Sequence, residues 1–248
     1  STNFIAGFPV VVNTGLASET QTLHNTCYDV GYSNSRGNPL WVVYRLHSAK
    51  DGEVAKRPAK FVMDDRTSAK IVHEHYNHSG YDRGHMAPNH AIGALCSDDA
   101  QMETFKMSNI IPQSPNLNEK WWERLERVEF NHFTKIFDQV WVIDGPIFST
   151  HPVTLPNSNG KVQVPEQNYK IHVAQKDSKW HVIAFLVDQG VQGKEPLSQY
   201  LSTIAEIEQK TGLSFLTQLP ADVQSALKFS KGDPIWKLDQ VDNLPSKY

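Results

Sequence analysis

The chain has 248 residues, of which 39% are hydrophobic and 21% are charged, and its formal net charge at pH 7 is −3. This composition is typical of a soluble globular protein, and the length suffices for one domain, which we expect to span residues 1–248. No apolar run approaches the roughly 20 residues of a membrane helix, and the charge argues weakly against a strongly basic nucleic-acid binder, although affinity depends on local charge along a groove.

Strand patterns recur along the chain. WVVYRL (41–46) is typical of a strand, and KFVMDDRT (60–67) of a strand edge followed by a turn. VWVIDGPIF (140–148) indicates a buried strand that stops at Gly-Pro. NYKIHVAQ (168–175) and KWHVIAFLV (179–187) have the spacing of a hairpin, so we expect them to be neighbouring antiparallel strands of one sheet.

Two helices are also predicted. The first covers residues 118–137, where apolar residues recur at helical spacing and Asn116 resembles an N-cap. The second covers residues 197–212, with Gly212 as its C-terminal stop. From about residue 228 a polar tail with two prolines is expected to wrap the surface. The pattern predicts an α+β fold in which helices flank a mixed or antiparallel sheet.

Five of the 11 histidines fall within residues 73–90, HEHYNHSGYDRGHMAPNH. His73 and His75 would share a face on a strand and, with His78, could bind zinc. However, no cysteine lies nearby. Solvated loop histidines are the alternative interpretation for these three and for His90.

The segment SGYDRGH (79–85) has the composition of a phosphoryl-transfer site. Gly80 and Gly84 would let the backbone approach a ligand closely. Arg83 offers a fork of donors suited to phosphate, and His85 is the side-chain type suited to proton transfer near neutral pH. The alternative is an ordinary Asp-Arg-Gly turn with a hydrogen-bonded histidine.

A second candidate site follows in MSNIIPQSPNLNEKWWERLE (107–126). The amide oxygen of asparagine is a neutral, hard ligand suited to Mg²⁺, and Asn118 lies in the first turn of the predicted helix. Glu126 lies roughly 80° around the helix from Asn118 and therefore faces broadly the same side. The alternative is that the asparagines are caps and Glu126 is a solvated glutamate.

SGYDRGHMAP and, about 30 residues later, SNIIPQSPNLNEKWWERLE closely resemble the DNA/RNA non-specific endonuclease family, which includes the Serratia-type nucleases and endonuclease G. The resemblance covers roughly residues 27–220, with GYSNSRGNPLWVVYRL, GPIF and EIEQKTGLSF in family order. It implies a ββα-metal finger core on the central sheet.

The resemblance also implies a role for each matching residue. His85 would be the general base, and Asn118 would be the sole protein ligand of a catalytic Mg²⁺, for which Mn²⁺ or another divalent ion can substitute. Glu126 would bind water on that ion. Arg83 and Asn109 would support the site and the transition state.

Relatives usually place an arginine before the DRGH motif, where it grips the substrate phosphate. Arg57 and Arg66 are both candidates in this chain, and we favour Arg66. Asp82, inside the motif, is expected to be structural.

The expected function is that of a sugar-non-specific endonuclease. Water activated by histidine does not need the ribose 2′-hydroxyl, so both DNA and RNA should be substrates, with 5′-phosphate and 3′-hydroxyl products. The main alternative is a catalytically silent nucleic-acid or partner-binding module with the same fold. A metal-dependent phosphatase or phospholipase is a further one.

Such an activity endangers its own cell, so confinement or an inhibitor protein is expected. The chain begins STNFIAG without a signal peptide, and we expect an extracellular or periplasmic protein whose leader has been removed. Cys27 and Cys96 could form one disulfide, which would suit that location, or remain two buried thiols.

Overall fold

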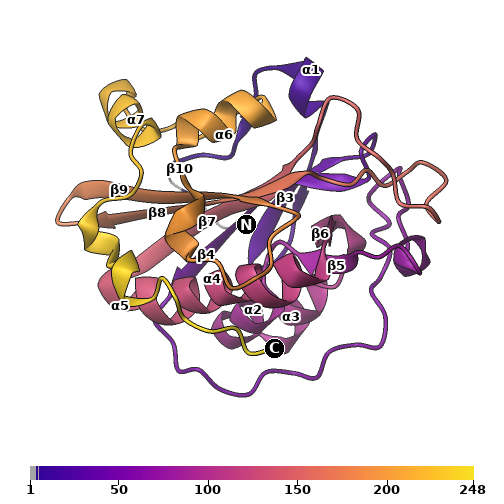
Figure 1. Ribbon diagram of the computed structural model, residues 1–248, viewed down its shortest axis with the longest axis horizontal. Helices are drawn as coiled ribbons and strands as arrows, with labels where there is room; N and C mark the ends of the chain where they lie inside the picture. The colour runs from indigo at the N-terminus through magenta and orange to yellow at the C-terminus, as the bar shows by residue number, and fades with distance from the viewer. Residues whose placement is uncertain (1–3, 5) are drawn as a thin grey trace.

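The computed structural model describes residues 4 and 6–248. Its centre is a seven-stranded antiparallel sheet with the strand order β10-β9-β8-β7-β4-β3-β2 (Figure 1). The strands are β2 (Gln21–His24), β3 (Tyr28–Ser33), β4 (Asn38–His47), β7 (Gln139–Ile147), β8 (Gln167–Lys176), β9 (Lys179–Asp188) and β10 (Leu201–Ser202). The predicted α+β class is confirmed, with an antiparallel sheet.

Helical segments cover both faces of the sheet, which gives three layers (Figure 1). One face carries α2 (Asn89–Leu95), α3 (Asp98–Glu103), η3 (Leu117–Trp122), α4 (Glu123–Val128), η4 (Glu129–Phe133) and α5 (Thr134–Ile136). The other carries α1 (Thr14–Ala17), α6 (Ile204–Thr211) and α7 (Ala221–Lys228). Among the described residues, no helix has the length and apolar character required to cross a membrane.

The remaining elements are short. They are β1 (Val10–Val11), η1 (His73–Tyr76), β5 (Asp82–His85), η2 (Met107–Asn109), β6 (Ile110–Gln113), η5 (Leu197–Tyr200), β11 (Leu213–Ser214), η6 (Pro234–Trp236) and η7 (Leu238–Gln240). β1 pairs with β11, and β5 pairs with β6, in two separate two-stranded sheets.

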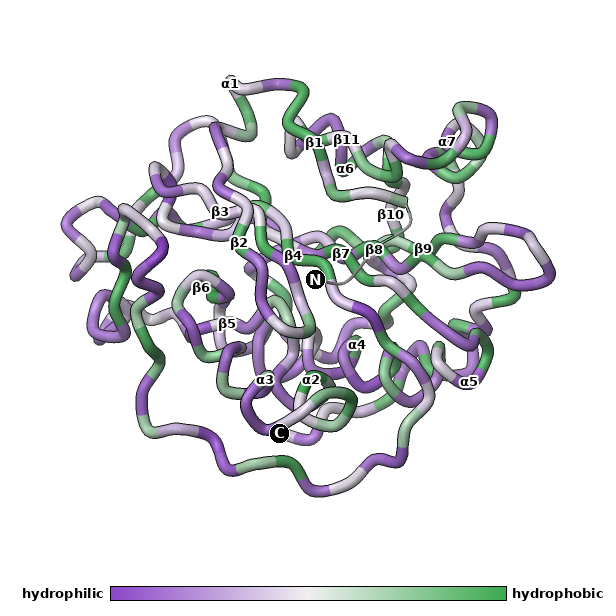
Figure 2. The backbone as a smooth tube through the Cα atoms, turned by 180° about the vertical axis from the view of Figure 1, so that it is seen from behind, coloured by the Kyte–Doolittle hydropathy of each residue, from purple (hydrophilic) through white to green (hydrophobic). Residues whose placement is uncertain are grey.

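The central strands carry buried apolar side chains on both sides because both faces of the sheet are covered. In β4, Val42 and Tyr44 pack against the layer that contains η3 and α4, whereas Trp41 and Val43 pack against the layer that contains α6. Figure 2 shows the hydrophobic residues concentrated along these strands. Burial of a side chain of this size stabilises the fold by about 1.5–3 kcal/mol.

The helix predicted at 118–137 is confirmed as one continuous run from η3 to α5, in which α-helical and π-helical turns alternate. Its predicted start is wrong. Asn116 is already helical and makes no capping hydrogen bond, whereas Ser114 Oγ accepts a hydrogen bond from the Leu117 N–H at 3.3 Å. The helical conformation therefore begins just after Ser114, at Pro115, a residue that suits a first helical turn.

The β8–β9 hairpin is confirmed, and its turn residues Asp177 and Ser178 both have positive φ angles, 51° and 63°.

The prediction that segment 140–148 stops at Gly-Pro is wrong, because β7 continues through Pro146. β7 pairs with β4 only as far as Asp144, so Pro146 lies where one side of the strand has no partner and a missing N–H is tolerated. Segment 60–67 contributes only an isolated bridge at Val62.

The helix predicted at 197–212 is correct only in its second half. Leu201 and Ser202 form β10, which pairs with the edge of β9, and the helix begins after Thr203, whose hydroxyl accepts a hydrogen bond from the Glu206 N–H at 3.1 Å. Gly212 ends the helix in the left-handed conformation, as predicted. Strand pairing at an open sheet edge therefore outweighs the helical spacing of the leucines.

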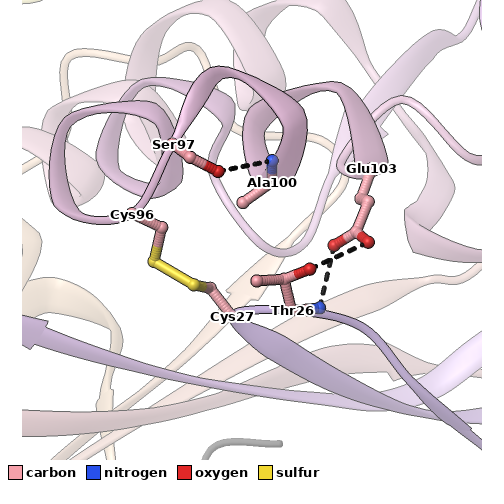
Figure 3. The surroundings of a disulfide bond; sticks show 6 residues. All are labelled: Thr26, Cys27, Cys96, Ser97, Ala100 and Glu103. Carbon is pink, nitrogen blue, oxygen red and sulfur yellow. Dashed lines mark hydrogen bonds between the residues drawn. A yellow bond between two sulfur atoms is a disulfide. The ribbon is translucent and has the colours of Figure 1, made fainter.

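A disulfide joins Cys27, beside the start of β3, to Cys96 at the end of α2, with 6.7 Å between the Cα atoms. Beside it, the backbone N–H and the hydroxyl of Thr26 donate to the Glu103 carboxylate at 2.9 and 3.0 Å (Figure 3). These contacts hold α2 and α3 against the β2–β3 turn.

A charged group lies fully buried between η4 and the sheet. Glu129 accepts hydrogen bonds from Tyr44 at 2.6 Å and Lys170 at 3.2 Å, and it lies 2.6 Å from His172 Nε2. Lys170 also lies 3.5 Å from Asp144, whose pKa is raised well above its usual value by burial. Burial opposes ionisation of Glu129 as well, but Lys170 and His172 outweigh that effect and lower its pKa. One positive and one negative charge therefore balance in the core.

The tail after residue 228 follows the helical layer, as expected, but it also contributes to the core. The Trp236 side chain is fully buried. Arg124, in α4, is buried and donates four hydrogen bonds to backbone carbonyls, two of them in the tail, at Leu244 (2.6 Å) and Asp242 (3.0 Å). The tail, yellow in Figure 1, ends beside α2 and α3.

Candidate active site

β5, β6 and the helix that begins with η3 form the ββα unit expected from the sequence. His85 lies opposite Ile110, and Asp82 lies opposite Gln113. Gly84 leaves room for the buried Gln113 side chain, since a Cβ atom there would lie 2.2 Å from Gln113 Oε1. The hairpin therefore presents Asp82, Arg83 and His85 from one short strand next to the helix that carries Asn118.

A pocket of about 340 Å³ lies between this unit, α2, α4 and the tail. Five of the predicted residues line it, namely Arg57, Arg83, His85, Asn118 and Glu126. The other charged and imidazole groups on its walls are Asp51, His90, Glu119, Glu123, Arg127 and Lys247. The five predicted residues, which are spread over the 70 positions from Arg57 to Glu126, thus meet in one cavity.

His85 is 8% exposed, and its ring packs edge-on against Phe105 at 4.8 Å and beside Phe61 at 5.3 Å. Its Nε2 atom is buried and has no hydrogen-bond partner among residues 4 and 6–248. Burial, with a smaller effect of the nearby Arg57 guanidinium, lowers the pKa of His85 to about 3. The imidazole is therefore neutral near pH 7, which is the form that a general base needs.

Asn118 lines the pocket, and its amide orientation is fixed from behind. Nδ2 donates to Asp82 Oδ2 at 3.0 Å, which leaves Oδ1 without a hydrogen-bond partner in the described chain. A neutral amide oxygen of this kind is a suitable ligand for a hard divalent cation. Within the same residues, no group of three or more His, Cys, Asp or Glu side chains could hold a metal ion.

Glu126 lies on the same pocket wall, eight residues after Asn118. Burial raises its pKa to about 8, against the attraction of Lys170 and with the repulsion of Glu129 adding to the rise. The carboxyl group is therefore largely protonated at pH 7 when no cation is present. A divalent cation beside it would favour the carboxylate by Coulomb attraction.

The structure brings Arg57, and not the favoured Arg66, to the pocket. The Arg66 guanidinium makes two hydrogen bonds to Asp64, at 2.8 and 2.6 Å, and others to His24 O and Asn25 Oδ1 at 2.8 and 3.0 Å. These partners hold Arg66 against the β2–β3 turn. Arg57 is exposed and lies 5.4 Å from the centre of the Phe105 ring, which also packs against His85.

Arg83 lines the pocket with part of its guanidinium already held. It donates to His73 O and to Asn77 Oδ1, both at 2.8 Å.

Asn109 does not line the pocket. Its side chain accepts from the Ala87 N–H at 2.9 Å and donates to the carbonyls of Ala87 and Thr104 at 3.0 Å. Asn109 therefore supports the site by fixing the segment that follows His85.

The other histidines of segment 73–90 do not form the zinc site considered above. His73 and His75 lie in the 3-10 turn η1 and not on a strand, and each Nδ1 atom accepts a backbone N–H, from Phe61 at 3.2 Å and from Val72 at 3.0 Å. His90 lines the pocket, where its Nε2 lies 2.8 Å from Asp51 Oδ1.

Several residues of the site were missed from the sequence. Phe61 and Phe105 lie outside the pocket lining and form the apolar surroundings of His85, whereas Arg127, Lys247 and Tyr248 line the pocket itself. The tail residues carry no local signal, because they reach the pocket through contacts between α4 and the tail backbone that join positions far apart in the sequence.

Known proteins resemble this chain in sequence and in fold. A model of the family described as DNA/RNA non-specific endonuclease matches residues 10–222. A nuclease of Nostoc sp. is 27% identical over 226 residues, which cover 87% of this chain and 80% of that protein. The mitochondrial nuclease EXOG of Mus musculus is 33% identical over 150 residues, 58% of this chain but only 38% of that protein.

The crystal structure of the EndoG/EndoGI complex contains a chain that superposes with a TM-score of 0.71 at 24% identity. The match covers 85% of this chain and 91% of that chain. At this level of identity the likeness establishes the fold alone.

Proposed function

This chain belongs to the DNA/RNA non-specific endonuclease family, and from that premise we propose that its pocket hydrolyses phosphodiester bonds of both DNA and RNA with His85 as general base and one Mg²⁺ ion. The products would carry 5′-phosphate and 3′-hydroxyl ends. The observation that supports this proposal is the gathering of His85, Asn118 and Glu126 in one pocket together with Arg57 and Arg83.

His85, which lines the pocket, would take a proton from the attacking water through an imidazole nitrogen. The new oxygen–phosphorus bond forms as the bond to the 3′-oxygen breaks. The low pKa of His85 makes the imidazole a weak base, but the charge of a bound phosphodiester would raise that pKa. General-base assistance of this kind is typically worth about 10²–10⁴-fold in rate.

Arg57 and Arg83 would stabilise the charge that develops on the phosphate oxygens. Arg57 can move to the substrate because it is exposed and makes no hydrogen bond within the described chain. Arg83 is more restrained, since His73 and Asn77 hold one side of its guanidinium.

Asn118 Oδ1 would hold the cation, with Asp82 orienting the amide from behind. When bound, a divalent cation would supply charge neutralisation at the phosphate and at the leaving oxygen. Glu126 would hold a water molecule that donates a proton to the leaving 3′-oxygen. Mn²⁺ or another divalent ion could substitute for Mg²⁺, because one amide ligand discriminates little between hard cations.

We also propose an extracytoplasmic location, extracellular or periplasmic, or else control by an inhibitor protein. The disulfide between Cys27 and Cys96 supports the first of these, because such bonds persist in oxidising compartments.

The test is cleavage of supercoiled plasmid and of structured RNA, each with Mg²⁺ and with EDTA. The wild-type protein should cut both substrates only with the metal, and His85→Ala should lose most of this activity. His90→Ala is the matched control, since His90 lines the same pocket but is paired with Asp51. Cutting that survives His85→Ala would refute the assigned base. No cutting with any divalent metal would leave a binding module as the better account.

A further inference from the structure

The tail contributes a wall to the pocket although it lies beyond the part of the chain that the family model matches. Lys247 and Tyr248 both line the cavity that contains His85 and Glu126. In Figure 1 this end of the tail, in yellow, lies beside α2 and α3. Lys247 and Tyr248 therefore lie in the site, although neither has a role in the proposed catalytic mechanism.

Helix α4 fixes the tail in place, and it is the helix that carries Glu126. The buried Arg124 guanidinium holds the carbonyls of Asp242 and Leu244, and Arg127 donates to Pro245 O. The backbone N–H of Lys247 donates to the Glu123 carboxylate at 3.4 Å. The last residues of the tail are thus positioned relative to the catalytic side chains by one rigid element.

The side chains of Lys247 and Tyr248 remain available. Four basic side chains line the pocket, but Arg83 donates to backbone and amide oxygens and Arg127 pairs with Glu123. Within the described chain, Arg57 and Lys247 are the two whose side chains make neither an ion pair nor a hydrogen bond. Tyr248 is 80% exposed, so its ring can meet a ligand without rearrangement of the fold.

We propose that Lys247 and Tyr248 form part of the nucleic-acid-binding surface, with the Lys247 ammonium on a backbone phosphate next to the cleaved one and the Tyr248 ring stacked on an unpaired base. This inference rests on the proposed function. A free ammonium beside an exposed aromatic ring is the combination by which proteins bind single strands, because the cation follows the phosphates and the ring accepts any base. The chain carries a net charge of −3, so its attraction for a polyanion depends on where its cations lie.

The test is binding of a short fluorescent single-stranded oligodeoxynucleotide, and of the matching duplex, by the full chain carrying His85→Ala to prevent cleavage. Lys247→Ala should weaken binding and lower the slope of log affinity against log salt by about 0.7 for the single strand. Tyr248→Ala should weaken single-strand binding roughly 5- to 150-fold without changing that slope, and Tyr248→Phe should bind like the parent.

Two variants on other parts of the surface serve as matched controls. Lys179→Ala removes an exposed lysine at the start of β9, and Phe229→Ala removes an aromatic ring that is 74% exposed after α7. Both should bind like the parent.

Three results would overturn the inference. If both tail variants bind like the parent while the wild-type protein still cuts plasmid, the tail assignment alone fails. An equal loss on duplex and single strand with Tyr248→Ala would refute base stacking. If the wild-type protein neither cuts nor binds nucleic acid, the proposed function fails, and the tail assignment fails with it.

Discussion

Arg57 and Arg66 should have opposite effects when each is replaced by alanine, because one faces the pocket and the other holds a turn. Burial would raise the pKa of Asp64, but hydrogen bonds from Arg66 and Ser108 lower it from 3.8 to about 2. A lowering of this size corresponds to about 2 kcal/mol. The Arg66 side chain is 35% exposed, so solvent screening reduces its share to about 1–2 kcal/mol.

Arg66→Ala should therefore lower the free energy of unfolding by about 1–2 kcal/mol in urea denaturation at pH 7, with kcat/KM on plasmid close to wild type. The depressed pKa of Asp64 stabilises the folded state fully above pH 3.8, and this contribution is lost as the pH falls through about 2. The difference in stability between wild type and Arg66→Ala should therefore shrink below pH 4.

Arg57→Ala should instead lower activity and leave the stability of the fold unchanged. The urea midpoint should not move, because the side chain is exposed, and kcat/KM should fall about 10²–10³-fold through loss of transition-state stabilisation. The reasoning would be refuted if Arg66→Ala abolished cleavage with an unchanged midpoint. Such a result would mean that Arg66 leaves Asp64 and reaches the substrate.

Three further changes test other parts of the structure. Removing the disulfide with Cys27→Ser and Cys96→Ser should cost about 4 kcal/mol, because the bond closes a loop of 69 residues, and urea unfolding compared with the oxidised wild type measures this loss. Asn109→Ala should cost on the order of 2–4 kcal/mol and lower kcat, since it leaves three buried backbone groups unpaired, two at Ala87 and one at Thr104; an unchanged melting curve would contradict this. Asn118→Ala should raise the Mg²⁺ concentration needed for half-maximal cleavage, and Asn118→Asp should restore part of the loss; identical metal titrations would refute the ligand role.

The parts of the fold that follow from local pattern could be predicted from the sequence. The strands of the β8–β9 hairpin are apolar and separated by a short polar turn, and the helix after β6 shows helical spacing over its whole length. In both cases the decisive interactions are local. The ββα unit was instead expected from the resemblance to the nuclease family, carried by two motifs about 30 residues apart.

The misassigned parts depend on partners that are distant in sequence. Leu201 lies in a strand because an open edge of β9 accepts it. Arg66 is unavailable to substrate because His24 and Asn25 bind it from more than 40 positions away. The capping of the long helix differs for a more local reason, since Pro115 already fits the first helical turn and moves the cap back to Ser114.

The buried group of Glu129, Lys170, His172 and Asp144 has a consequence for how this chain can vary. Loss of either charged member alone leaves an uncompensated ion in the core, which typically costs about 3–5 kcal/mol, whereas exchange of the whole group for apolar residues of similar volume is often neutral. Single substitutions in this group should therefore lower the stability of the fold strongly, whereas simultaneous replacement of the whole group should not. A pairwise mutational scan should record this as strong epistasis between Glu129 and Lys170, in a part of the core that supports the helix carrying Glu126.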